Sequence, residues 1–107
     1  MPFGPWRPLD GLTPPSGPGL LQARLDQGAA GLLDYPRGRS AMVYYDGDDD
    51  DLVAAVGRLR ARAAGAEHRV YVRFAPPPQE PPSAAAARLR EAFRHRFGAP
   101  PRWNAPT

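Results

Sequence analysis

The sequence of 107 residues contains no cysteine and no lysine. Without cysteine it can form no disulfide bond, thiolate metal site or thiol nucleophile, which is typical of a reducing compartment and favours a cytoplasmic protein. Without lysine it can supply neither a Schiff base nor the lysine of a P-loop. All 14 basic residues are arginine, which is typical of a GC-rich bacterial genome or of selection for bidentate contacts with phosphate or carboxylate.

Long apolar runs are also missing, and the N-terminus has no basic region followed by an apolar stretch. We therefore expect no membrane contact and no secretory signal. Histidine is scarce, and nothing in the sequence near His68 or His95 would orient its ring for a Ser/His/Asp triad. The glycine-rich stretches match neither nucleotide-binding fingerprint, so we expect no cofactor.

The acidic run at residues 46–51 invites comparison with a calcium loop. A loop of the EF-hand type needs glycine at its sixth position and a bidentate glutamate at its twelfth. Here glycine is second and the twelfth position is Gly57. We expect the run to be the solvated start of a helix, and we predict no metal site.

Prolines gather at the two ends and at residues 76–82. This distribution predicts a proline-rich extended arm at 1–18 without regular hydrogen bonding, one ordered domain at 19–104, and a tail at 105–107. The run 20–25 is compatible with a strand or with one or two helical turns, and we take it as a strand that ends in a turn at 26–28. The other predicted strands span residues 31–35, 40–45 and 68–75.

Two helices follow from the 3.6-residue spacing of apolar side chains. One begins after the aspartate run at Leu52, continues to Ala63 and stops at Gly65; the other is capped by Ser83 and runs to Phe97. The order predicts an α+β fold in which two helices pack on a small mixed or antiparallel sheet of about four strands. We expect one common core containing Val56, Leu59, Val70, Val72, Phe74, Leu89 and Phe93.

Charge is divided along the chain. Residues 1–56 hold four arginines and eight aspartates, a net charge of −4, whereas residues 57–107 hold ten arginines and three glutamates, a net charge of +7. Basic side chains interleaved with an aromatic residue favour contact with nucleic acid or another anion. The candidate anion-binding residues are Arg69, Tyr71, Arg73, Arg88, Arg90 and Arg94.

The arrangement of several short motifs resembles the GIY-YIG endonuclease domain over residues 17–104. The motifs are a Pro-Gly pair at Pro18 that opens a strand, a Tyr-Tyr-Asp-Gly strand end at 44–47, an immediate helix, and a last helix that leads to Pro-x-x-Asn at 101–104. The resemblance implies a site in which two tyrosines assist the deprotonation of water, an arginine steadies the phosphate, a glutamate holds the metal and an asparagine completes the site.

Only part of that site is present at the matching positions. Tyr44, Tyr45, Glu91 and Asn104 are the residues that an active member would use here. Leu21 stands where the first tyrosine belongs, Ala54 or Ala55 stands where the arginine belongs, and alanines precede Glu91 on the last helix. Loss of the metal ligand removes charge stabilisation of the transition state, so the resemblance implies a member without nuclease activity.

Three functions remain open. We favour a non-catalytic binding or adaptor module for a protein partner, with docking through Phe3, Trp6 and Trp103. The first alternative is a nucleic-acid-binding protein that uses the arginine-rich strand and helix. The second alternative is an active nuclease that cleaves phosphodiester bonds.

Overall fold

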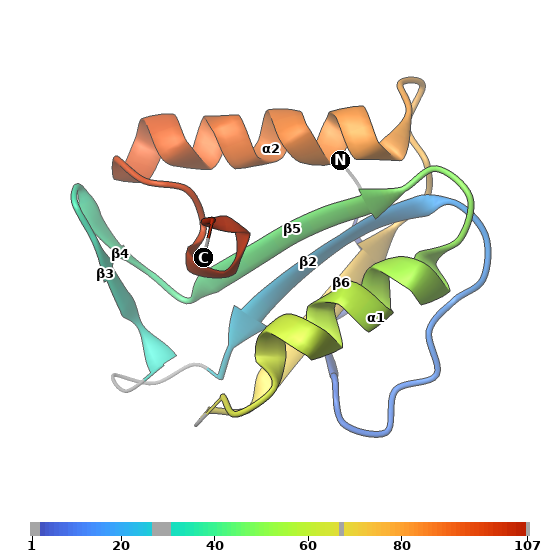
Figure 1. Ribbon diagram of the computed structural model, residues 1–107, viewed down its shortest axis with the longest axis horizontal. Coiled ribbons are helices and arrows are strands. Elements are labelled where there is room, and N and C mark those ends of the chain that lie inside the picture. The colour runs from blue at the N-terminus through green and yellow to red at the C-terminus, as the bar shows by residue number, and fades with distance from the viewer. Residues whose placement is uncertain (1–2, 27–30, 67, 107) are drawn as a thin grey trace.

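The centre of the molecule is a twisted antiparallel sheet with one helix on each side (Figure 1). The computed structural model describes residues 3–26, 31–66 and 68–106. The sheet has the order β1-β6-β2-β5, with β1 (Arg7–Pro8), β2 (Gly19–Leu25), β5 (Met42–Asp48) and β6 (Val70–Ala75). The remaining elements are the hairpin strands β3 (Leu33–Tyr35) and β4 (Gly38–Ser40), the helices α1 (Leu52–Ala63) and α2 (Pro82–Phe97), and the 3-10 turn η2 (Arg102–Asn104). The predicted α+β fold with a four-stranded sheet and two helices is confirmed.

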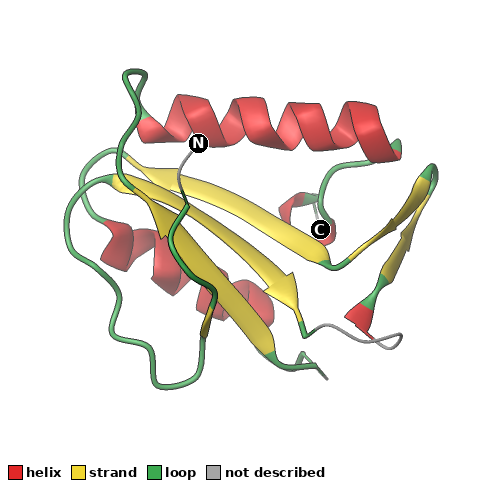
Figure 2. Ribbon diagram, turned by 180° about the vertical axis from the view of Figure 1, so that it is seen from behind, coloured by secondary structure: helices red, strands yellow, loops and turns green. Residues whose placement is uncertain are grey.

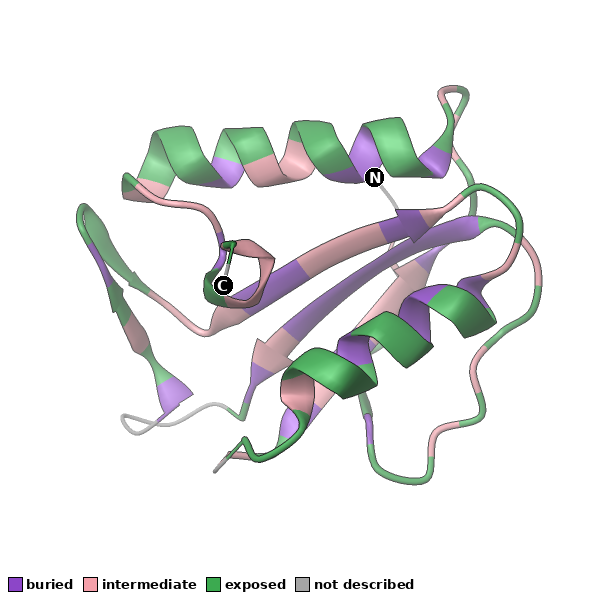
Figure 3. Cartoon of the chain, in the orientation of Figure 1, coloured by how far each residue is buried: buried purple, intermediate pink, exposed green. Residues whose placement is uncertain are grey.

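β2 lies in the middle of the sheet and is buried on both faces (Figure 3). Leu21 belongs to the core cluster that includes Val56 of α1, whereas Leu20 packs with Ala86 of α2. Successive side chains of a strand point to opposite faces, so the two helices cover different faces of the sheet. Neither helix within the described ranges is long and apolar enough to cross a membrane.

The prediction of one common core is therefore wrong for Leu89 and Phe93 of α2, whereas the other five predicted residues do pack together. Val56 and Val72 lie in the cluster under α1, but Phe93 of α2 packs in an aromatic group on the other face. Its ring centroid lies 5.0 Å from that of Tyr35 and 4.5 Å from that of Phe97. The apolar stripes of the two helices have separate places of burial because the sheet lies between them.

The N-terminal arm, described here over residues 3–18, contributes the short edge strand β1 to the sheet. Arg7 and Pro8 pair with Val72 and Tyr71 of β6, so the prediction that the arm has no regular hydrogen bonding is wrong. The flanking amides complete the pairing. Gly4 N–H donates to the Phe74 carbonyl at 2.7 Å, and Leu9 N–H donates to the Val70 carbonyl at 2.9 Å. Proline is tolerated here because β1 is an edge strand, which has one side free of the ladder.

Strand boundaries also differ from prediction at residues 31–45. Leu33–Tyr35 and Gly38–Ser40 form a separate two-stranded hairpin, and the third strand begins only at Met42. The hairpin leans on the end of α2, where Arg37 N–H donates to the Phe97 carbonyl at 2.9 Å. Most of the predicted turn at 26–28 lies outside the described residues.

α2 begins at Pro82, two residues before the predicted first helical residue Ala84, and Ser83 is not its cap. Asp49, from the loop after β5, replaces the cap: its carboxylate accepts the Ser83 N–H at 2.9 Å and the Ser83 hydroxyl at 2.8 Å. Gly47 permits this close approach, because a Cβ at that position would stand 2.2 Å from the Pro82 carbonyl oxygen. α1 is capped locally, by the Asp51 side chain.

Candidate functional site

The two adjacent tyrosines of β5 point to opposite faces of the sheet. Tyr44 pairs with Ala23 on the α1 face, and Tyr45 pairs with Gln22 on the other face. The Tyr44 hydroxyl donates to Asp46 Oδ2 at 3.0 Å, and burial, followed by the charge of Asp46, raises the pKa of Tyr44 to about 12. A phenol in this environment stays neutral well above neutral pH.

Tyr45 and Asn104 lie together at the outer edge of β5. The Tyr45 N–H donates to Asn104 Oδ1 at 2.9 Å, and Asn104 Nδ2 donates to the Tyr45 carbonyl at 3.0 Å. The Tyr45 hydroxyl accepts a bond from Gln22 Nε2 at 2.8 Å. Burial raises the pKa of Tyr45, and the bond from Gln22 opposes that rise.

Glu91 is exposed on α2, and its carboxylate is already paired with neighbouring side chains of that helix. Its carboxylate accepts from Arg94 Nη2 at 2.6 Å and lies 3.2 Å from His95 Nε2. The bond from Arg94 holds the pKa of Glu91 below its ordinary value. Of the four residues implied by the resemblance, the structure brings Tyr45 and Asn104 together and leaves Tyr44 and Glu91 apart from them.

The positions implied for the missing catalytic residues are equally informative. Leu21 is fully buried in the core under α1, and Ala55 is fully buried there too. Ala54 is exposed on α1. A polar group at Leu21 would need a partner inside an apolar cluster.

Asp46 and Asp48, at the end of β5, form contacts within the fold. Arg58 of α1 bridges Asp46 and Asp48, at 2.8 Å and 3.1 Å. Asp48 also accepts backbone N–H groups of Asp50 and Asp51, and these bonds lower its pKa. Within the described residues, no three His, Asp or Glu side chains are grouped so that they could hold a metal ion.

The arginines of α2 are engaged with their own chain. Arg88 forms an ion pair with Glu80, and Arg94 forms one with Glu91. Arg90 Nη1 donates to the Tyr45 carbonyl at 3.2 Å. Each of the three side chains is thus bound to a different group of the chain, and together they do not form a row of unpaired cations.

Arg69, just before β6, and Arg73, within β6, are not paired with a described carboxylate. Arg69 is fully exposed, and a side-chain bond with Tyr71 raises its pKa. Arg73 lies on the sheet face away from α1, directly opposite Gln22 of β2, and Tyr71 lies opposite Arg24. These register positions bring Arg24, which the sequence analysis did not select, beside two residues that it did select.

Trp6 of the arm covers the two arginines. The Cζ atom of Arg24 lies 4.4 Å from the centroid of the Trp6 ring, and that of Arg73 lies 4.5 Å from the same centroid. Both distances are within the range of cation–π attraction. Figure 2 shows the start of the arm, next to the N-terminus, in front of the sheet on the face that lies opposite α1. We call Trp6, Gln22, Arg24, Tyr71 and Arg73 the arginine–tryptophan cluster.

One polar atom of the arginine–tryptophan cluster has no hydrogen-bond partner among the described residues. Arg73 Nε donates to Gln22 Oε1 at 2.6 Å, and Gln22 in turn reaches Tyr45. Arg24 Nε is buried and has no hydrogen-bond partner among the described residues. No described carboxylate forms an ion pair with Arg24 or Arg73.

No protein-family model, curated protein or solved structure matches this chain. The chemistry of the site therefore rests on its residues.

Burial is the main cause that lowers the pKa of Arg73, and the neighbouring charge of Arg24 adds to it. Arg24 and Arg73 are both half-buried, and they lie over the same Trp6 ring without an ion-pair partner among the described residues. Two such guanidinium groups form a site suited to an anion.

The three aromatic residues predicted to dock a partner all contact their own domain. Phe3 packs against the cluster around Leu20 and lies under Arg73, with 4.9 Å between Cζ and the ring centroid. Trp6 covers the two arginines, and Trp103 is half-buried against the core under α1. Trp6 therefore reaches any partner only as one wall of the arginine–tryptophan cluster.

Proposed function

We propose that the chain is a non-catalytic binding module, an inactive relative of GIY-YIG domains, that holds an acidic segment of a protein partner at the arginine–tryptophan cluster. One observation carries this function. The buried Nε of Arg24 has no hydrogen-bond partner among the described residues, and a second guanidinium, that of Arg73, lies close enough to add its positive charge to the site. An unsatisfied buried donor costs free energy, and a carboxylate would satisfy it.

The geometry favours a carboxylate over a long polyanion. Two adjacent guanidinium groups suit one or two side-chain carboxylates, each bound through two parallel hydrogen bonds. A nucleic acid needs a row of cations that follows its phosphates, and Arg88 and Arg94 of α2 are instead paired with glutamates. Tyr71 and Trp6 supply apolar walls beside the charges.

The absence of catalysis is supported by the separation of the side chains that a nuclease would need. Tyr44 and Tyr45 face opposite sides of the sheet, and Glu91 is occupied by Arg94. A hydrolytic site requires these groups around one reacting phosphate.

A labelled peptide of ten glutamates tests the function, with a matched glutamine peptide as the neutral control. Arg24→Gln and Arg73→Gln should each weaken binding of the acidic peptide about tenfold or more, because a charge-assisted hydrogen bond contributes about 1.5–3 kcal/mol. Arg62→Gln removes the same charge from exposed α1 and should leave the affinity nearly unchanged.

Competition with single-stranded DNA distinguishes the alternatives. DNA that displaces the peptide and binds more tightly, with affinity that falls steeply with salt, would support the nucleic-acid function instead. Equal losses for Arg62→Gln and Arg73→Gln would mean that net charge alone attracts the peptide, and the assignment to the cluster would be wrong.

A further inference from the structure

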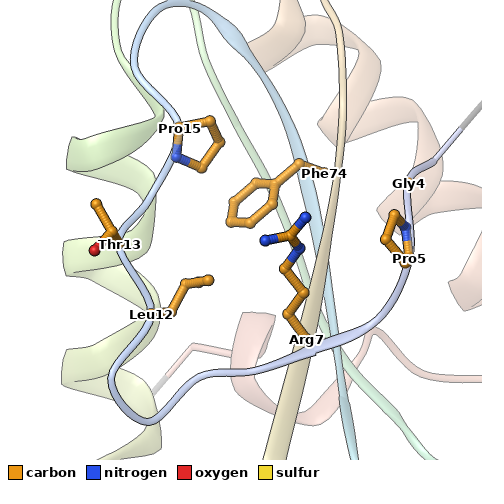
Figure 4. Close-up of a pocket in the computed structure, with 7 residues that line it drawn as sticks. All are labelled: Gly4, Pro5, Arg7, Leu12, Thr13, Pro15 and Phe74. Carbon is orange, nitrogen blue, oxygen red and sulfur yellow. The ribbon is translucent and has the colours of Figure 1, made fainter.

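A hollow of about 300 Å³ lies inside the bend of the N-terminal arm, beside β6 (Figure 4). Its apolar walls are Phe74 of β6 with Leu12, Pro5 and Pro15 of the arm, and its only charged lining residue is Arg7. We call it the arm pocket. It shares none of its lining residues with the arginine–tryptophan cluster.

The walls of the arm pocket are held by bonds to the rest of the fold. At one end, Gly4 N–H donates to the Phe74 carbonyl. In the middle, Arg60 Nη2 donates to the Leu12 carbonyl at 2.7 Å. Beyond the pocket, Gly17 N–H donates to the side chain of Asp51. A pocket with tethered walls is largely formed before a ligand arrives, which reduces the entropy cost of binding.

The side chains in the hollow divide into an apolar wall and one cation. In Figure 4 the Phe74 ring and the Arg7 guanidinium both point into the space between the two stretches of the arm. Arg7 is exposed and forms no ion pair with a described carboxylate, and no acidic residue lines the pocket. A ligand that complements this pocket therefore has one anionic group attached to an apolar body.

We propose that the arm pocket binds a small organic carboxylate with an aromatic or branched aliphatic body. The body lies against Phe74, Leu12 and the prolines, and the carboxylate accepts hydrogen bonds from the Arg7 guanidinium. The volume agrees with a ligand of modest size, since pockets for small molecules begin at about 300 Å³. Arginine suits this role because its planar donors match the two carboxylate oxygens.

The test uses the full chain and three probes: phenylacetate, its neutral analogue phenylacetamide, and acetate. Backbone amide NMR should show phenylacetate shifting the resonances of Gly4, Thr13 and Phe74, with much weaker binding by the amide and by acetate. Arg7→Gln should weaken phenylacetate binding about tenfold and leave phenylacetamide binding unchanged. Because Arg7 is exposed and its backbone pairing with Val72 remains, the variant should fold normally.

One control variant tests where phenylacetate binds. Arg73→Gln removes a charge from the arginine–tryptophan cluster and should leave phenylacetate binding unchanged. If Arg73→Gln abolishes binding while Arg7→Gln does not, or if phenylacetate moves no arm resonance at millimolar concentration, the proposal is overturned. Equal affinity of acid and amide would likewise remove the role assigned to Arg7.

Discussion

The side-chain amide of Asn104 pairs with the backbone of Tyr45 as a neighbouring strand would, accepting from its N–H at 2.9 Å and donating to its carbonyl at 3.0 Å. β5 is an edge strand of the sheet, and an open edge attracts other strands. Asn104 therefore closes the edge at its middle and fastens the C-terminal turn to the sheet. This role accounts for the residue without any catalysis.

Replacing Asn104 with alanine should lower the free energy of unfolding by about 1–3 kcal/mol, because it leaves the Tyr45 N–H without its partner in a half-buried place. Urea denaturation measures the change. Gln79→Ala, at an exposed loop position, is the control and should have little effect. An Asn104→Ala variant as stable as the parent would contradict the pairing.

Two glycines should respond oppositely to alanine. At Gly47 a Cβ would stand 2.2 Å from the Pro82 carbonyl oxygen, so Gly47→Ala should destabilise the fold by about 1–3 kcal/mol, as overpacking does. At Gly57, on the exposed side of α1, a Cβ would meet nothing within 4 Å, and Gly57→Ala should stabilise the helix by about 0.5–1 kcal/mol. Thermal melts measure both changes, and a Gly47→Ala variant that melts no lower than the parent would refute the close contact between β5 and α2.

Alkaline pH should destabilise the fold through Tyr44. Burial raises its pKa to about 12, above the value near 10 of an unfolded chain, so the neutral phenol is favoured in the folded state. The resulting stability is fully present below about pH 10 and is lost as the pH rises from there through 12. Tyr44→Phe should flatten the fall in unfolding free energy over this window, measured by urea denaturation at several pH values. Tyr35 and Tyr45, whose pKa values are also raised, should account for the fall that remains.

Nuclease activity should be absent with magnesium or manganese, because Tyr44, Tyr45 and Glu91 do not face one cleft. Incubation with plasmid and with a labelled oligonucleotide measures cleavage. Contaminating nuclease is identified by the variants Tyr44→Phe and Glu91→Ala, which would leave its activity unchanged. Cleavage that disappears in either variant would show that the chain is an enzyme.

The sequence predicted the regular elements best where periodicity was strong. The alternation in residues 68–75 and the spacing of Leu52, Val56 and Leu59 correctly indicated β6, which begins two residues later at Val70, and α1. The arm was mispredicted because proline content argues against pairing, whereas an edge strand tolerates proline when flanking amides complete the ladder. The start of α2 was displaced because its cap, Asp49, is distant in sequence.

The candidate site was only half visible in the sequence. Tyr71 and Arg73 could be selected from their alternation with apolar residues on one strand. Arg24 could not, because the segment 20–25 was predicted as a strand without a partner, and only the β2–β6 register places it opposite Tyr71. The contribution of Trp6 depends on where the arm lies against the sheet, which no local pattern encodes.

The pairing of β1 with β6 joins positions 7 and 72, so β2, the β3–β4 hairpin, β5 and α1 all lie between the two partner strands. Closing such a long loop is slow compared with forming the β2–β5 pair, whose partners are much closer in sequence. We infer that the arm docks late in folding, after β6 has joined β2. Both the Trp6 wall and the arm pocket are then acquired in the last step, and an opening of the arm alone would remove both without unfolding the helices.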